Sequence, residues 1–248
     1  MRPSISALLF ALVFVVGPVR PLPAAPVAAL VPGLSTPPDL PSGASAYWRA
    51  GTVVTLKGES HVIDRVGANH FVAPAPWFTV SPAGGFALDG TQVEGLRLPI
   101  KPSVDPRFTV GVDLCPDAAG TEHQTILNLY RFCELRYRLS KAELTFNVWQ
   151  TSVDDRSKEV VTSVTLPVPV GRWSRVRAQI EGDKIRLVLD EAKAERRLPG
   201  TWEFLPPTVA GIIGLGGADR VYRGRFDHLY LAAGPDAIAL PGPAPASP

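Results

Sequence analysis

Hydrophobic and polar residues alternate with a period of two from Gly171 to Asp190, on both sides of a turn at 182–183. Alternation around a Gly-containing two-residue turn predicts an antiparallel β-hairpin with one buried face. The predicted cross-strand pairs are Ile180–Ile185, Ala178–Leu187, Val176–Leu189, Glu181–Lys184 and Arg175–Asp190. Each of the last two is an opposite-charge pair worth roughly 0.2–1 kcal/mol. The hairpin therefore indicates a fold more than a function.

A second hairpin is predicted around the loop 140–143. Its apolar row pairs Leu135, Tyr137 and Leu139 with Val148, Phe146 and Leu144, and its other face pairs Glu134, Arg136 and Arg138 with Trp149, Asn147 and Thr145. Further strands are predicted at 52–56, 86–98, 108–114, 125–139, 143–150, 160–166, 209–215 and 225–231, with 190–198 as the one helical candidate. Many short strands with turn punctuation predict an all-β protein, an antiparallel two-sheet jelly-roll sandwich.

The two ends of the chain differ from this β-rich middle. Arg2, the apolar run 5–17 and the small residues that follow predict a signal peptide over 1–29, cleaved after Ala24 or Ala29. The apolar run is shorter than the ~20 residues of a membrane span. A Pro-rich linker is expected at 30–45 and a Pro/Ala-rich tail at 235–248, which leaves 46–234 for one β-domain. We expect a secreted, periplasmic or cell-envelope protein without a membrane span after signal cleavage.

Charge and cysteine usage narrow the class of protein. With 25 basic and 23 acidic residues, the chain lacks the basic balance of a nucleic-acid binder, and we expect no nucleic-acid partner. Cys115 and Cys133 predict a single disulfide in an oxidising compartment, worth roughly 3 kcal/mol. However, Cys133 alternates in phase with Leu135, whereas Cys115 is out of phase with Leu114. A bridge therefore requires a bulge or a strand end at one cysteine, which Pro116 could mark.

Six segments follow one another in a recognisable order. They read FALDGTQVEGLRLP at 86–99, FTVGVDLCPD at 108–117, TILNL at 125–129, ELTFNV at 143–148, the hairpin 171–190 with Trp173, and GRFDHLYLA at 224–232. This ordered set resembles the concanavalin A-like lectin/glucanase superfamily, specifically its bacterial laminin-G-like, pentraxin-related domains. The resemblance implies a jelly roll that is usually non-catalytic and often binds glycans or proteins. The family's Asp-Gly and Asp-Glu are here Asp190-Glu191 and Asp227-His228, so the resemblance transfers no functional site.

No catalytic constellation is visible in the sequence. Retaining glucanases of the same superfamily place carboxylates on alternate residues of one strand, about 5 Å apart. No Glu-x-Asp-x-x-Glu pattern occurs, and 190–195 is interpreted as carrying solvated loop acids. The four histidines lack metal-ligand or triad spacing. We therefore expect no enzymatic activity, with a polysaccharide hydrolase or lyase as the least favoured alternative.

Arginines supply the one hypothesis for a ligand site. If the two hairpins share a sheet, their outward faces bring together Arg136, Arg138, Asn147, Trp149, Arg175, Arg177, Gln179 and Arg186. Guanidinium groups suit carboxylate or sulfate, and a Trp ring suits the apolar face of a sugar. The pattern favours a glycan partner, including an anionic polysaccharide. The alternative interpretation is an ordinary solvated sheet face, whose charges include Glu134 and Asp190.

Loop carboxylates make calcium the one candidate cofactor. Asp117, Asp154, Asp155 and Asp219 lie in suitable loops, although their spacing does not show that they converge on one point. The function expected from the sequence is an exported, non-catalytic laminin-G-like module that binds glycan. The alternative is a structural or protein-interaction domain of the cell envelope, with an envelope protein as its partner and no small ligand.

Overall fold

The computed structural model describes residues 44–234 except 57–58, 68, 73–77, 83, 92–94, 99–105, 206–210 and 217–218. The predicted signal peptide, almost all of the linker and the predicted tail lie outside these residues. Within them, the only helix is the three-residue turn η2 (Ala50–Thr52), and no helix has the length and apolar character of a membrane span.

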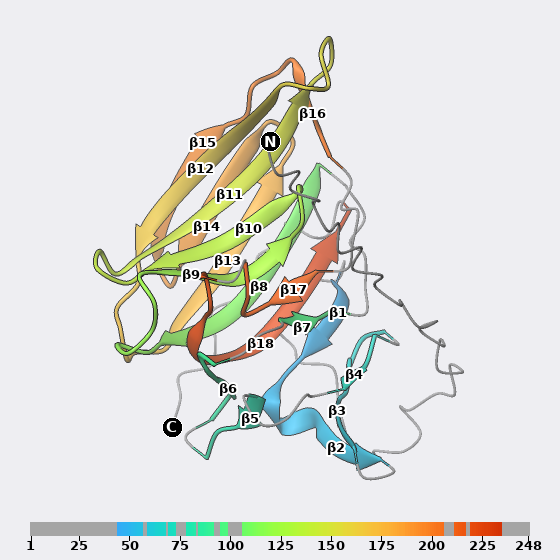
Figure 1. Ribbon diagram of the computed structural model, residues 1–248. Helices are drawn as coiled ribbons and strands as arrows, with labels where there is room; N and C mark the ends of the chain where they lie inside the picture. Colours follow the sequence, from blue (N-terminus) through green and yellow to red (C-terminus); the bar gives the residue numbers. More distant parts are fainter. Residues whose placement is uncertain are drawn as a thin grey trace, which may run out of the picture.

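Antiparallel strands make up three sheets in the described part of the chain (Figure 1). The eight-stranded sheet runs β15 (Ala192–Arg197), β14 (Lys184–Leu189), β13 (Ser174–Glu181), β8 (Arg107–Pro116), β18 (Arg223–Ala233), β6 (Phe86–Asp89) and β5 (Phe78–Val80), with β1 (Ala44–Trp48) also paired to β18. The seven-stranded sheet runs β12 (Glu159–Pro167), β11 (Glu143–Ser152), β10 (Cys133–Arg138), β9 (His123–Leu129), β17 (Ile212–Ile213) and β7 (Leu96–Arg97), with β16 (Trp202–Phe204) on β11. The small third sheet runs β2 (Val53–Leu56), β3 (Glu59–Val62) and β4 (Phe71–Val72).

The two large sheets pack face to face, with β12 and β11 against β14 and β15 (Figure 1). Their inner faces carry the alternate apolar residues, which belong to one core cluster. The ring of Phe108 on β8 meets that of Phe132, just before β10, edge-on with 5.1 Å between centroids. Contacts of this kind join the sheets, so the prediction of an all-β sandwich is confirmed.

The first predicted hairpin has the expected register. β13 and β14 pair Ile180 with Ile185 and continue in step to Val176 and Leu189, all of them buried. The strands close beyond this point through a hydrogen bond of 3.0 Å from the Asp190 amide to the carbonyl of Arg175. The alternation in the sequence was sufficient here because the two-residue turn leaves only one register.

The second hairpin forms with a register shifted by two residues. Leu135 lies opposite Phe146 rather than Val148, because the chain turns over 139–142 and not over 140–143. Ala142, with φ at 49°, closes this turn through its amide to the carbonyl of Leu139. A shift of two keeps every side chain on its predicted face. The predicted pairs are therefore wrong, but the inward and outward rows are right.

Three predicted elements divide or change type. The segment 125–139 forms β9 and β10 with a turn at 130–132, and the segment 86–98 contributes β6 and β7 to different sheets. The segment 190–198 forms the edge strand β15 instead of a helix, because it pairs with β14 along its length. The remaining predicted strands occur with shifted ends; the predicted strand 209–215 is described only from residue 211.

The two cysteines are both free thiols, so the disulfide prediction is wrong. The side chain of Cys115 projects from the outer face of β8, where its Sγ accepts a hydrogen bond of 3.3 Å from Arg225 Nη2. Cys133 belongs to the core between the sheets, and burial raises the pKa of its thiol. Because the cysteines lie on different sheets and opposite faces, no bulge at one of them brings the sulfur atoms together.

Candidate functional site

The eight residues of the arginine hypothesis are divided between the two sheets. β10 and β11 carry Arg136, Arg138, Asn147 and Trp149, whereas β13 and β14 carry Arg175, Arg177, Gln179 and Arg186. Outward side chains of two sheets that share a core leave the sandwich on opposite sides. The proposed single surface therefore does not form, because β13 pairs with β8 of the other sheet.

On the eight-stranded sheet, the predicted residues take part in local contacts. Arg175 Nε lies 3.3 Å from Asp113 Oδ1, and burial raises the pKa of that carboxyl. Arg186 Nη2 lies 3.1 Å from Glu181 Oε2 in the same hairpin. The other two, Arg177 and Gln179, are half-buried and buried in β13. Two of the four residues therefore form ion pairs within their own sheet.

On the seven-stranded sheet, Arg136 and Trp149 line one hollow of about 380 Å³. The other lining residues come from β9, the turn after it, β10, β12 and the loop before β18: Asn128, Tyr130, Arg131, Glu134, Glu159 and Arg220. Asn147 is outside the lining but bonds to Glu134, whereas Arg138 lies apart and pairs with Glu122. Two of the predicted residues therefore meet at a concave surface, and a third supports it.

Glu134 lines the hollow and is 2% exposed. Its Oε1 accepts hydrogen bonds from Thr125 Oγ1 at 2.8 Å and from Arg220 Nη1 at 3.0 Å. Its Oε2 accepts from Arg136 Nη2 at 2.7 Å and from Asn147 Nδ2 at 3.4 Å. Charge-assisted bonds of this kind are short and directional. The carboxylate therefore fixes two guanidinium groups at the surface of the sheet.

The turn between β9 and β10 supplies the rim. Arg131 adopts φ of 63°, and the Phe132 amide closes the turn on the carbonyl of Leu129 at 2.8 Å. Because Phe132 is buried in the core, the two residues before it are directed outward. Tyr130 is 50% exposed, and Arg131 forms an ion pair with Glu159 on β12. An exposed phenol ring and an ion pair thus border the half-buried ring of Trp149.

This hollow is polar and has aromatic walls. Three arginines and two glutamates line it, a formal charge of 3 − 2 = +1. Guanidinium and amide groups donate to hydroxyl or carboxylate oxygens, and Trp and Tyr rings offer apolar faces with a polar edge. Hollows of this composition suit ligands that are both hydroxylated and partly apolar.

The sequence did not reveal the residues that complete the site. Tyr130 and Arg131 were placed inside a continuous strand, although the sequence 130–132 is a turn with a left-handed residue. Arg220 comes from a loop 86 residues beyond Glu134, and no local sequence pattern predicts a contact between residues so far apart in the chain. The only signal in the sequence for these contacts was that Arg and Glu residues occupy the outward row of β10.

The predicted calcium ligands are not brought together. Asp117 follows β8, where its Oδ1 accepts from the Ala119 amide at 2.9 Å, and this bond is the largest cause of its lowered pKa. Asp155 caps its own loop by accepting from Ser157 Oγ at 2.7 Å. The other two, Asp154 and Asp219, are exposed in separate loops. Among the described residues, no group of three or more His, Cys, Asp or Glu could hold a metal ion.

Comparisons with known proteins identify the fold. No protein-family model and no curated protein matches the sequence. Domain 4 of AbnA, a GH43 extracellular arabinanase from Geobacillus stearothermophilus solved with arabinotriose, aligns over 79% of this chain and 94% of its own, at 12% identity and a TM-score of 0.53. Trypanosoma rangeli sialidase aligns over 77% of this chain but only 31% of its own, at 12% identity and a TM-score of 0.51. A pentraxin from Limulus polyphemus aligns over 58% and 73%, at 16% identity and a TM-score of 0.39.

The first two likenesses show a β-sandwich fold shared with domains of carbohydrate-active proteins. This chain spans about a third of the sialidase and nearly all of the arabinanase domain. The fold class and the hollow on the seven-stranded sheet together define a β-sandwich with a polar, aromatic-walled surface.

Proposed function

We propose that this protein is an exported, non-catalytic glycan-binding module of the concanavalin A-like, laminin-G-like type, and that the hollow on the seven-stranded sheet is its binding surface. The observation that carries the proposal is the meeting of Trp149 and Tyr130 with the guanidinium groups that Glu134 holds in place. The rings pack against the apolar face of a sugar, while the guanidinium groups donate to its oxygens. Because these donors are already fixed, binding requires little further ordering.

The likeness to the arabinanase domain solved with arabinotriose supports a saccharide as the ligand and suggests arabinan as the first probe. The formal charge of +1 in the hollow suits glycans that carry acidic groups as well as neutral ones. An anionic polysaccharide therefore remains within the proposed ligand class.

The state of the carboxylates supports a non-catalytic role. Both oxygens of Glu134 accept two hydrogen bonds each, and Glu159 forms an ion pair with Arg131. A general acid must give up a proton to its substrate, and a nucleophile needs an unoccupied oxygen. Glu134 has no unoccupied oxygen in this arrangement, and Oε1 of Glu159 is engaged by Arg131.

Affinity electrophoresis tests the proposal. The full chain is run through gels that contain arabinan, polygalacturonate or methyl-esterified polygalacturonate, and retardation in at least one is expected. Trp149→Ala should weaken binding about tenfold or more, as for a central aromatic contact. Trp202→Ala is the matched control, because Trp202 lies on β16 of the same sheet outside the hollow. Equal retardation of both variants, or none in any gel, would contradict the proposal.

A further inference from the structure

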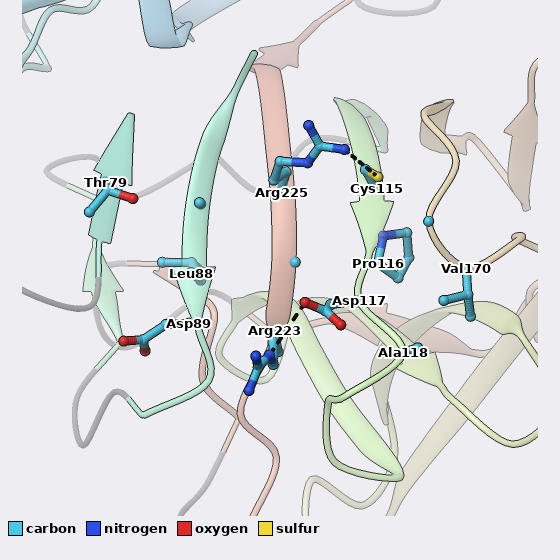
Figure 2. Close-up of a pocket in the computed structure, with 13 residues that line it drawn as sticks. Thr79, Leu88, Asp89, Cys115, Pro116, Asp117, Ala118, Val170, Arg223 and Arg225 are labelled. Carbon is cyan, nitrogen blue, oxygen red and sulfur yellow. Dashed lines mark hydrogen bonds and ion pairs between the residues drawn. The ribbon is translucent and has the colours of Figure 1, made fainter. Parts of the chain in front are cut away.

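A larger hollow, of about 630 Å³, lies on the outer face of the eight-stranded sheet, where β18 begins (Figure 2). Its floor is made of small or apolar residues, among them Ala87 on β6, Pro116 on β8 and Gly224 on β18. Ala87 lies directly opposite Arg225 on the neighbouring strand and has a short side chain, so the outer surface of the sheet is lower there than at the arginine. The sheet that carries this hollow is not the sheet of the glycan-binding surface proposed above.

Arg225 forms one wall and is held from two sides. Its guanidinium carbon lies 5.1 Å from the ring centroid of Trp173, a cation–π distance, and its Nη2 donates to Cys115 Sγ at 3.3 Å. Trp173 is itself fixed over Gly85, where an added Cβ would lie only 2.6 Å from the indole ring. The position of the Arg225 guanidinium is therefore set by packing before any ligand arrives.

Arg223 stands two residues earlier on the same face of β18, near the other end of the hollow (Figure 2). Its Nε donates to Asp117 Oδ2 at 3.4 Å, and its backbone amide donates to Gln124 Oε1 at 2.9 Å. Asp89, the cross-strand partner of Arg223 on β6, also lines the hollow. This end thus presents one guanidinium between two carboxylates.

The balance of charge identifies the class of ligand. Two arginines and two aspartates line the hollow, so their formal charges cancel, 2 − 2 = 0. Burying an unpaired charge there would be costly, which disfavours an ionic ligand. A hydroxyl group donates to a carboxylate and accepts from a guanidinium, so neighbouring hydroxyls satisfy both kinds of group. The apolar floor suits the C–H face of a sugar ring.

We infer that this hollow is a second saccharide-binding site, which takes a neutral, hydroxyl-rich ligand. It shares no residue with the hollow on the seven-stranded sheet, and it lies on the opposite outer face of the sandwich. Each site can therefore be present or absent without the other.

Nuclear magnetic resonance of the full, ¹⁵N-labelled chain tests the inference with arabinotriose, xylotriose and cellotriose at millimolar concentration. The backbone amides of Gly171 and Gly224 should shift in a saturable way with at least one of these neutral trisaccharides. Ala118→Trp, an exposed lining residue, should fill the hollow and reduce these shifts at least tenfold. Ala119→Trp, in the same loop but outside the lining, is the matched control and should leave them unchanged.

The outcomes separate this inference from the proposed function. Absence of shifts at Gly171 and Gly224 with all three probes overturns the second site, and so do shifts that persist in Ala118→Trp. The Trp149→Ala variant retains these shifts if the two sites are independent. A shift at the indole of Trp149 alone supports the first site and overturns the second, whereas shifts confined to Gly171 and Gly224 do the reverse.

Discussion

Glu134 and Arg220 lie 86 residues apart in the chain, and the Nη1 atom of the arginine donates to Oε1 of the buried carboxylate at 3.0 Å. This bond fixes the loop before β18 onto the outer face of the seven-stranded sheet. Arg136 binds the second oxygen of the same carboxylate at 2.7 Å. The geometry of the proposed glycan-binding surface therefore depends on one buried negative charge.

Replacing that charge should destabilise the protein. Glu134→Gln keeps the shape of the side chain but leaves two guanidinium groups without their counter-ion, at a cost of about 2 kcal/mol. Urea unfolding at neutral pH measures the loss. Glu143→Gln, at the end of the adjoining strand β11, is the control and should change stability by less than about 0.5 kcal/mol. A Glu134→Gln variant as stable as this control would show that the carboxylate does not organise the site.

Glu122 should make stability depend on pH. Its hydrogen bonds from the Ser140 hydroxyl, from Arg138 and from the Ser140 amide lower its pKa from 4.5 to about 2. Because the unfolded chain binds the proton more tightly, this contribution is complete above pH 4.5 and is lost as the pH falls towards 2. The difference between the parent and Glu122→Gln in urea should therefore be largest near pH 6 and vanish near pH 2.

The control for this prediction is Glu191→Gln, an exposed residue in the turn after β14. Its difference from the parent should stay small at every pH. A Glu122→Gln difference that is constant between pH 6 and pH 2 would contradict the account of this carboxylate.

Both cysteines should react with a thiol reagent. Cys115 and Cys133 project to opposite faces of different sheets, which excludes a bridge within one molecule. A thiol reagent in denaturant, without prior reduction, is expected to label two thiols per chain of protein purified under thiol-protecting conditions. Labelling of neither thiol, together with a mass two hydrogen atoms below that of the reduced chain, would contradict the arrangement of β8 and β10.

Gly111 should tolerate no side chain. A Cβ at this position would lie 1.9 Å from Cε1 of Tyr230, whose ring packs with Tyr47 over the outer face of β8. Gly111→Ala is expected to cost about 2 kcal/mol, because the buried ring must move. Gly200→Ala is the matched control, since nothing lies within 4 Å of its added Cβ. Equal thermal stability of the two variants would be inconsistent with this packing.

The period-two pattern predicted much of the fold. It identified the buried face of both hairpins, and the register of Ile180 with Ile185 is as predicted. It placed Leu135 two residues out of register, because alternation is unchanged by a shift of two and only the turn decides. A hairpin joins one sheet or the other through its pairing with strands that are distant in the sequence. The local pattern therefore could not predict that the arginines are divided between two sheets.

The candidate site was predicted only in part, because alternation identifies outward residues but not contacts between distant segments. Arg136 and Trp149 lie on outward rows that alternation identifies, and both line the hollow. Tyr130 and Arg220 come from a turn and from a distant loop, and their positions follow from the burial of Phe132 and the charge of Glu134. Those are tertiary contacts, which a single sequence does not display.

The most direct test of the glycan-binding proposal is the indole N–H spectrum of the protein during titration with an oligosaccharide. The oligosaccharide is taken from a polysaccharide whose gel retards the protein. The chain has five tryptophans, and each gives one indole signal that a Trp→Phe variant assigns. The account predicts a saturable shift of the Trp149 signal, while the signal of Trp202, outside the hollow, stays in place. Saturable binding that leaves the Trp149 signal unmoved would contradict it.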